Sequence, residues 1–141
     1  MNSKQLGQLG ELKAQYDFIK AGWEVSVPLG DYCSYDFIAI KGQKTLKIQV
    51  KTTEIIHHTD GVMKFSVNSA NYYVDKIYTK DDCDYFYLYC LENEQGYLWS
   101  INGSRASRIF LRVAAPKNGQ TKGINFAKDF EFFKIIKEIE T

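Results

Sequence analysis

The most regular alternation of apolar and polar residues in this chain lies in residues 35–52. Apolar residues at every second position predict two strands, and the polar stretch 41–44, which contains a glycine, predicts a tight turn between them. On such strands Asp36, Gln49 and Lys51 point away from the apolar side chains. The pattern therefore predicts a β-hairpin that carries a carboxylate, an amide and an ammonium group on one side of a hydrophobic core.

Residues 3–21 follow a helical period instead, with Ser3 as the expected N-cap and Gly22 as the expected C-cap glycine. Glu11 lies on a flank of this helix together with Lys4, Gly7, Gln8 and Gln15. Gly7 and Gly10 each cost a helix about 0.5–1 kcal/mol relative to alanine. We therefore expect either a tight helix–sheet contact or the close approach of a ligand beside Glu11. The apolar stripe that we expect to face the core consists of Leu6, Leu9, Leu12, Tyr16 and Ile19.

The rest of the chain alternates strand patterns with turns, and this order predicts the α/β class. A near-continuous apolar run at 84–90 indicates a strand that is buried on both faces in the middle of a sheet. We expect one mixed sheet of five or more strands, with the first helix packed on one face. The remaining expectations are an extension of the second hairpin strand through 55–56, strands at 23–27, 62–67, 97–101 (also interior) and 109–113, a helical turn within 68–77 and a loop at 114–123. For 126–139 the spacing of Phe130, Phe133 and Lys137 favours a helix over an extended segment, which remains the alternative.

Size and composition describe an ordinary globular protein. A chain of 141 residues with 45% hydrophobic and 25% charged residues is expected to form one domain, 1–141, with its own core. Three cysteines without a CxxC motif indicate reduced thiols. Because no apolar run reaches the length of a membrane span, we expect a soluble, cytoplasmic protein without a membrane partner. The adjacent His57 and His58 would point in opposite directions on a strand, which disfavours a metal site there.

The net charge of +1 hides a basic segment at about 104–128. This segment contains no acidic residue, so it is either a solvated loop or a surface that faces a polyanion. Its six basic residues are Arg105, Arg108, Arg112, Lys117, Lys122 and Lys128.

The order Glu11, Asp36, Gln49-Val50-Lys51 resembles the PD-(D/E)XK nuclease superfamily, in which an acid precedes a hairpin and a (D/E)XK tripeptide ends its second strand. The surrounding residues resemble the branch that contains group I intron-encoded homing endonucleases. This likeness covers the chain to about residue 129. The stretches that carry it are Lys4-x-x-Gly7-x-x-Gly10-Glu11, Gly22-Trp-Glu-Val-Ser-Val-Pro28, Gly30-Asp31, Tyr35-Asp36, Gln49-Val50-Lys51-Thr52, the strand from Asp84, the Arg-rich strand and 116–120.

The resemblance implies a restriction-endonuclease-like core, a mixed central β-sheet flanked by helices, and Mg²⁺-dependent (or Mn²⁺-dependent) cleavage of double-stranded DNA at specific sites. Asp36 would be the central metal ligand, joined by the Gln49 amide oxygen and the Val50 backbone carbonyl. Glu11 would bind the metal directly or through a water molecule. Lys51 would position the attacking water, aid its deprotonation and stabilise charge on the phosphate.

The family pattern has an acid where this chain has Gln49, although the homing branch itself carries this glutamine. The loss of one negative charge is expected to weaken binding of divalent cations and to favour one tightly held metal over two. The competing interpretation of the hairpin is a structural ion pair between Asp36 and Lys51, which would leave Gln49, Glu11 and the helical glycines unexplained.

The basic segment would then contact DNA, together with Lys4, Gly7 and Gln8 of the first helix. A chain of this size covers about one groove, so cutting both strands implies a homo-oligomer, either a dimer or a tetramer. Two alternatives remain open: a Holliday-junction-resolvase-like or repair nuclease on the same fold, and a catalytically inert DNA-binding module. The residues expected to contact phosphates or bases are Arg105, Arg108, Arg112, Lys117, Asn118, Gln120 and Lys122.

Overall fold

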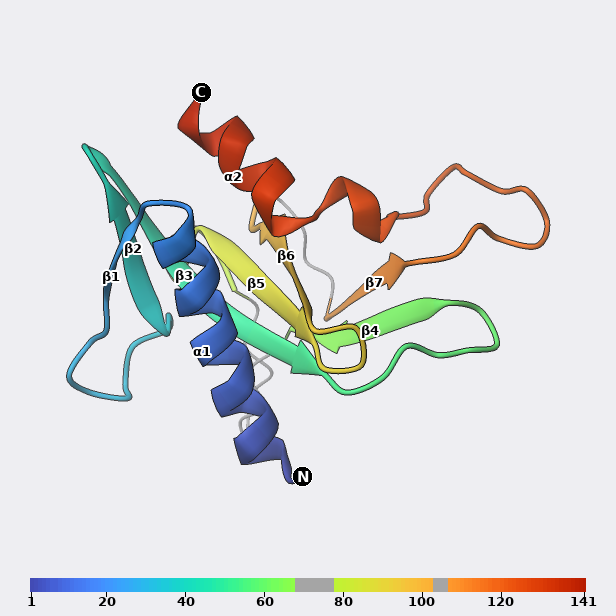
Figure 1. Ribbon diagram of the computed structural model, residues 1–141, viewed down its shortest axis with the longest axis horizontal. Coiled ribbons are helices and arrows are strands. Elements are labelled where there is room, and N and C mark those ends of the chain that lie inside the picture. Colours follow the sequence, from blue (N-terminus) through green and yellow to red (C-terminus); the bar gives the residue numbers. More distant parts are fainter. Residues whose placement is uncertain (68–77, 103–106) are drawn as a thin grey trace.

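A computed structural model describes residues 1–67, 78–102 and 107–141. The expected helical turn within 68–77 and Arg105 lie outside the described residues. A five-stranded mixed sheet of order β1-β2-β3-β5-β6 is accompanied by a two-stranded sheet, β4-β7 (Figure 1). The elements are α1 (Ser3–Lys20), β1 (Glu24–Ser26), β2 (Phe37–Lys41), β3 (Lys44–Thr53), β4 (Val62–Ser66), β5 (Tyr85–Cys90), β6 (Gln95–Ser100), β7 (Arg108–Arg112), a 3₁₀ turn (Ala127–Asp129) and α2 (Phe132–Glu140).

The predicted hairpin is confirmed. Strands β2 and β3 pair antiparallel from Phe37 opposite Ile48 to Lys41 opposite Lys44, and Gly42 in the turn has a positive φ of 61°. Strand β3 then pairs parallel with β5, whose residues are buried on both faces as expected. The expected extension of β3 through 55–56 is wrong: the strand ends at Thr53, because the chain already turns back so that His57 pairs with Val62.

Helix α1 begins and ends close to the expected residues, although its N-cap is Asn2 and not Ser3. The Asn2 side chain accepts a bond from the Gln5 backbone N–H, and the Gln5 side chain accepts one from the Asn2 N–H, both at 2.9 Å. This reciprocal capping box satisfies two donors that a helix start otherwise leaves unpaired. At the other end, Gly22 has the positive φ of 89° that favours glycine after a helix.

The expected core-facing stripe of α1 is wrong. The helix buries Gly10, Ala14, Asp17 and Phe18 against the sheet, while Leu6 is only partly buried. Small residues let the helix axis approach the strands closely, and the bulky stripe would have held it away. The buried Asp17 carboxylate is satisfied by the Tyr87 hydroxyl, which donates to it, and by Lys13 at 3.2 Å. The stripe residues Leu9, Leu12, Tyr16 and Ile19 are 37–59% exposed.

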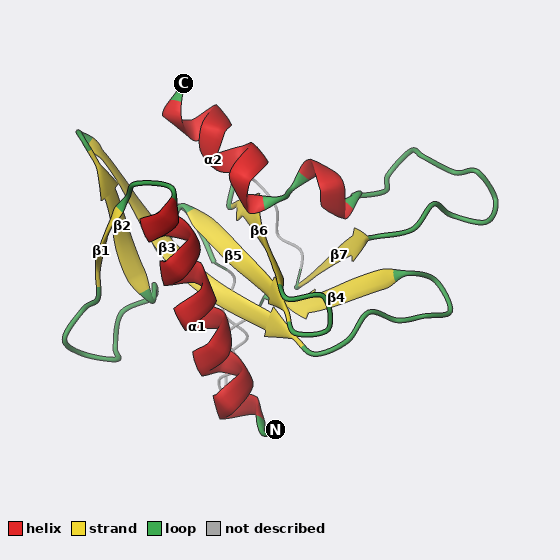
Figure 2. Cartoon of the chain, in the orientation of Figure 1, coloured by secondary structure: helices red, strands yellow, loops and turns green. Residues whose placement is uncertain are grey.

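The expectation of one sheet is also corrected, because β4 and β7 form a separate antiparallel ribbon (Figure 2). Two hydrophobic cores result, one on each face of the five-stranded sheet. The first core contains Phe18, Phe37 and Phe132 and lies between the sheet and the two helices. The second contains Phe65, Phe86 and Leu111 and lies between the sheet and the β4-β7 ribbon.

Two further expectations near the C-terminus need correction. Strand β6 is an edge strand of the sheet, not an interior one. The expected helix 126–139 is interrupted, because Phe130 and Glu131 run beside β6: the Leu98 N–H donates to the Phe130 carbonyl at 2.9 Å, and Tyr97 bridges to Glu131. This contact separates the 3₁₀ turn from α2. Among the described residues, no helix is long and apolar enough to cross a membrane.

Candidate active site

Asp36 lies where the β2–β3 pairing ends. Its backbone N–H donates to the Ile48 carbonyl at 2.7 Å, and its carboxylate accepts a bond from the Val50 N–H, also at 2.7 Å. The side chain thus continues the ladder where β2 stops, which fixes the carboxylate beside β3. Since the N–H and C=O of one strand residue point to the same edge, the Val50 carbonyl faces the edge that Asp36 occupies.

The two candidate carboxylates are close enough to affect each other's ionisation. Burial raises the pKa of Asp36, against the opposing effects of the Val50 N–H and Lys51. Burial also raises the pKa of Glu11, and the negative charge of Asp36 raises it further. Helix α1 therefore brings Glu11 into the electrostatic field of Asp36 at the hairpin. Two partly buried carboxylates that repel each other favour a bound cation.

Lys51 projects from β3 on the same face of the strand as Gln49. Burial lowers the pKa of its ammonium group, while the charge of Asp36 acts in the opposite direction. Among the described residues, Lys51 forms no direct ion pair with Asp36, so the structural ion pair considered above is absent. The Lys51 ammonium instead donates to the Tyr78 hydroxyl at 3.4 Å.

The potential metal ligands are all oxygen atoms. They are the Glu11 and Asp36 carboxylates, the Gln49 amide and the Val50 carbonyl, which is the kind of ligand set that suits a hard cation such as Mg²⁺. Within the part of the chain that the structure describes, the side chains of Glu11 and Gln49 form no hydrogen bond, so their oxygens remain available. The same residues contain no cluster of three His, Cys, Asp or Glu side chains that could hold a metal. The candidate set fits a divalent ion only with the amide and the backbone carbonyl included.

The two helical glycines have different environments. A Cβ on Gly10 would collide with the Thr52 methyl group and lie 3.3 Å from a Val50 methyl group, so this glycine allows α1 to cross β3. A Cβ on Gly7 would meet none of the described residues within 4 Å. The tight helix–sheet contact therefore accounts for Gly10, whereas the surface at Gly7, one turn before Glu11, stays open. Lys4 and Gln8 are exposed on this part of the helix.

The β4-β7 ribbon carries part of the basic segment on its outer face. Ser66 lies opposite Arg108 and Lys64 opposite Phe110, and all four are exposed, while Met63, Phe65, Ile109 and Leu111 are buried on the inner face. Lys64 and Phe110 were not among the residues that the sequence predicted to contact DNA. The alternation in 62–66 and 108–112 would have found their orientation, but only the pairing shows that they are neighbours.

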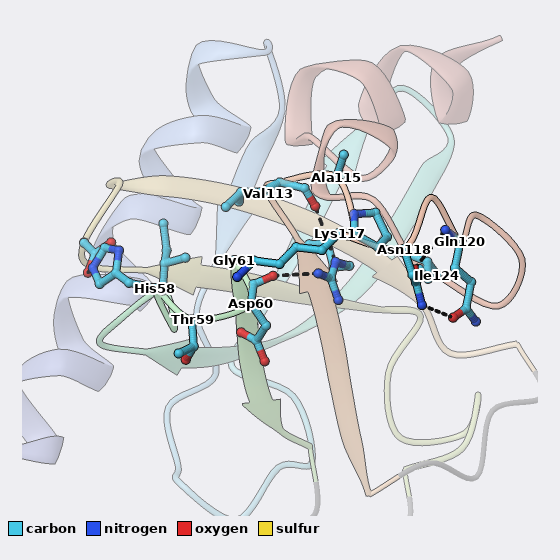
Figure 3. Close-up of a pocket in the computed structure, with 15 residues that line it drawn as sticks. His58, Thr59, Asp60, Gly61, Val113, Ala115, Lys117, Asn118, Gln120 and Ile124 are labelled. Carbon is cyan, nitrogen blue, oxygen red and sulfur yellow. Dashed lines mark hydrogen bonds and ion pairs between the residues drawn. The ribbon is translucent and has the colours of Figure 1, made fainter.

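Arg112 and the following loop form an open groove at the end of the ribbon (Figure 3). The Arg112 guanidinium donates to the Asp60 carbonyl at 2.8 Å and to the Ala114 carbonyl at 3.3 Å, so it holds the turn at 57–61. The groove has a volume of about 600 Å³ and is lined by Lys117, Asn118 and Gln120, but by none of the four candidate catalytic residues. Lys122 is exposed in the same loop.

Within this loop the two amide side chains are already engaged. The Gln120 backbone N–H donates to the Asn118 side chain at 3.0 Å, and the Gln120 amide donates to the Lys122 carbonyl at 3.2 Å. The structure thus gathers Glu11, Asp36, Gln49 and Lys51 at the hairpin. The predicted DNA-contacting residues are divided between α1, the ribbon and the distal loop.

A mixed sheet whose hairpin carries an acid and a Q-x-K strand end, crossed by a helix with a second acid, defines the class of PD-(D/E)XK nucleases. Comparison with family models agrees: the model described as PD-(D/E)XK endonuclease matches residues 1–133. The chain belongs to this family.

A solved structure has the same fold over nearly the whole length of both chains. It is described as the structure of a bacterial homing endonuclease, I-Ssp6803I, and it covers 99% of this chain and 97% of its own, with a TM-score of 0.76 and 24% sequence identity. No curated protein gives a significant match to the chain. The fold expected from the sequence, a PD-(D/E)XK core with a mixed central sheet and flanking helices, is confirmed.

Proposed function

We propose that this protein is a site-specific endonuclease of the homing type that cuts both strands of DNA by Mg²⁺-dependent (or Mn²⁺-dependent) hydrolysis. The observation that carries the proposal is the electrostatic cluster of Glu11, Asp36 and Lys51 at the end of a hairpin. Membership of an endonuclease family and the fold shared with a homing endonuclease support it.

Asp36, Glu11, Gln49 and the Val50 carbonyl are the groups that would hold the divalent ion. When bound, the ion would supply Lewis-acid stabilisation of the phosphate and a more acidic water molecule. The raised pKa values of both carboxylates indicate that the protein itself leaves their negative charge incompletely compensated. Gln49 contributes an oxygen without a charge, so affinity for the ion depends mainly on the two acids.

Lys51 would act on the attacking water and on the phosphate. Its ammonium lies within the field of Asp36 without pairing directly with it, so it remains free to donate to a phosphate oxygen. Burial also lowers its pKa, which brings proton exchange with water closer to neutral pH. Asp36 would hold the ion in a fixed position, because the Val50 N–H donates to its carboxylate and thereby fixes it.

DNA would lie along the outer face of the β4-β7 ribbon and the flank of α1 that bears Lys4, Gly7 and Gln8. The major groove of DNA admits a two-stranded ribbon, and this ribbon exposes Lys64, Arg108 and Phe110 in register. Lys117 and Lys122 would contact phosphates further along. Because Arg112 already binds two backbone carbonyls, its main role would be to hold the loop in place.

Cutting both strands at one site requires two active centres of opposite direction, which a two-fold symmetric oligomer supplies. The exposed stripe of α1 (Leu9, Leu12, Tyr16 and Ile19) is an apolar surface that the described residues of the chain leave uncovered. We propose that a second copy of the chain covers this stripe, since the proposed reaction needs a second copy and the stripe can pair with itself.

The decisive experiment is a cleavage assay on plasmid and genomic DNA with and without Mg²⁺, using wild-type protein, Asp36→Ala and Lys51→Ala. We expect discrete fragments from the wild type only, and unchanged DNA affinity for Lys51→Ala. Persistent cleavage by Lys51→Ala would contradict the assignment of the active site to these residues. DNA binding without any cleavage would favour the hypothesis of a catalytically inert DNA-binding module. Cleavage of four-way junctions alone would favour a resolvase-like nuclease.

A further inference from the structure

The ammonium group of Lys51 is in contact with an aromatic ring from a distant part of the chain. Its Nζ lies 3.4 Å from the Tyr78 hydroxyl and 4.9 Å from the centre of the Tyr78 ring. Tyr78 follows Lys51 by 27 residues and precedes β5. A lysine side chain has four flexible bonds, so a ring at this distance restricts where its charge can lie.

The Tyr78 ring is itself held against the sheet. It packs edge-on against Phe86, with ring centres 5.2 Å apart and an interplanar angle of 83°. Phe86 of β5 lies in register beside Gln49 of β3. The ring therefore covers the face of the sheet from which Gln49 and Lys51 project.

The turn that follows Tyr78 is anchored to the hairpin. The Asp82 N–H donates to the Thr79 carbonyl at 2.9 Å, and the Asp82 side chain accepts a bond from the Thr79 N–H at 2.9 Å. Lys47 of β3 donates to the Asp81 carbonyl at 2.8 Å. These bonds fix the backbone next to Tyr78 relative to the strand that carries Lys51.

We propose that Tyr78 is a positioning residue for Lys51. The ring attracts the ammonium, its hydroxyl accepts a bond from it, and together they hold the group away from a direct ion pair with Asp36. Tyr78 acts through Lys51 and needs no contact with DNA. The consequence for cleavage rests on the proposed function, whereas the contact between ring and ammonium does not.

One arm of the test requires no cleavage. In metal-free protein with ¹³C-labelled lysine, the ε-methylene protons of Lys51, assigned with Lys51→Arg, should be shifted upfield by the ring current of Tyr78. Tyr78→Phe should keep this shift, and Tyr78→Leu should abolish it. Tyr32→Leu, at an exposed tyrosine outside the site, is the matched control and should leave the shift unchanged. Tyr78→Met replaces Tyr78→Leu if the latter does not fold, as judged by circular dichroism.

The second arm measures single-turnover cleavage in Mg²⁺. Tyr78→Leu should lower the rate by about 10- to 100-fold because misplaced catalytic groups cost that much, with DNA affinity within about twofold of wild type. The cleavage rate of Tyr78→Phe should lie between those of the wild type and Tyr78→Leu. Wild-type rates for Tyr78→Leu, or an ε-methylene shift that does not depend on the ring, would overturn the proposal. A ring-dependent shift in a protein that cleaves no DNA would overturn the proposed function and leave the positioning contact supported.

Discussion

At the scale of single residues, the site is a set of compromises between burial and charge. Asp36 and Glu11 are disfavoured as charged groups by burial, and Glu11 also by the charge of Asp36. A protein selected only for stability would not place two such acids together. The sequence identified both residues, because the acid, the hairpin and the Q-x-K end lie in a recognisable order. It could not show that their charges interact, since 25 residues separate them.

Glu11→Gln should therefore stabilise the metal-free protein at neutral pH. The folded-state pKa of Glu11 lies above its unfolded value, so stability falls as pH rises through the window between the two values. At pH 7 the charged Glu11 carboxylate destabilises the folded state, so removing its charge should raise Tm by about 1–3 °C. Below the unfolded pKa the two proteins should have the same Tm.

The measurement is thermal unfolding in EDTA from pH 3 to 8, with Glu24→Gln, an exposed acid on β1, as control. Added Mg²⁺ should stabilise the wild type more than Glu11→Gln. Equal stability of wild type and variant at pH 7 would show that the charge of Glu11 does not destabilise the fold.

At the scale of elements, the crossing of α1 over β3 decides where Glu11 lies. The sequence predicted the helix correctly, but the apolar stripe that it predicted to be buried is exposed. Hydrophobic periodicity assumes that the largest apolar face turns inward. Here close approach to β3 selects small residues, and Gly10 and Ala14 lie at the contact. Phe18 alone supplies the large buried ring of α1.

Two glycine substitutions on α1 should have opposite effects on stability. Gly10→Ala should destabilise the fold by about 1–3 kcal/mol, because its methyl group would collide with Thr52 and crowd Val50. Gly7→Ala should stabilise it by about 0.5–1 kcal/mol, since the site is open and alanine favours the helix. Urea unfolding of both variants measures the difference.

DNA affinity separates the structural from the functional role of Gly7. If DNA approaches this helix face, Gly7→Ala should bind DNA more weakly despite its greater stability. Unchanged affinity would remove Gly7 from the proposed DNA contact, and a stable Gly10→Ala would mean that the helix–sheet contact is looser than the structure has it.

At the scale of the whole molecule, the β4-β7 ribbon turns a basic stretch of sequence into a surface. The sequence predicted both strands but placed them in the central sheet. Their pairing with each other brings Lys64 and Ser66 beside Phe110 and Arg108 on one exposed face. The basic segment thus combines with residues 40 or more positions earlier in the chain.

Arg108→Ala should weaken DNA binding and lower the slope of log K against log [salt] by about 1, as expected for the loss of one phosphate contact. Lys137→Ala on α2 is the control, because it removes an equal charge from an exposed position outside the ribbon. Fluorescence anisotropy at several salt concentrations measures both. The same slope for wild type and Arg108→Ala would place the DNA elsewhere.

The proposed oligomer makes a separate prediction about α1. Leu12→Glu in the exposed stripe should convert the protein to monomers in light scattering and should reduce double-strand cutting, since a buried charge without a partner opposes association. Leu29→Glu, at a fully exposed leucine outside the stripe, should leave the molecular mass unchanged. A wild-type protein that is monomeric with and without DNA would contradict the proposed contact.

The sequence by itself determined the helix, the hairpin and the order of the candidate residues, because each depends on local periodicity or on a short motif. Only the tertiary structure decided which face of α1 is buried, that β4 and β7 leave the main sheet, and that Tyr78 meets Lys51. Those features depend on which segments, distant in sequence, come into contact. The physical reason is that periodicity reports which side chains avoid water, whereas close packing selects which of them fit against one another.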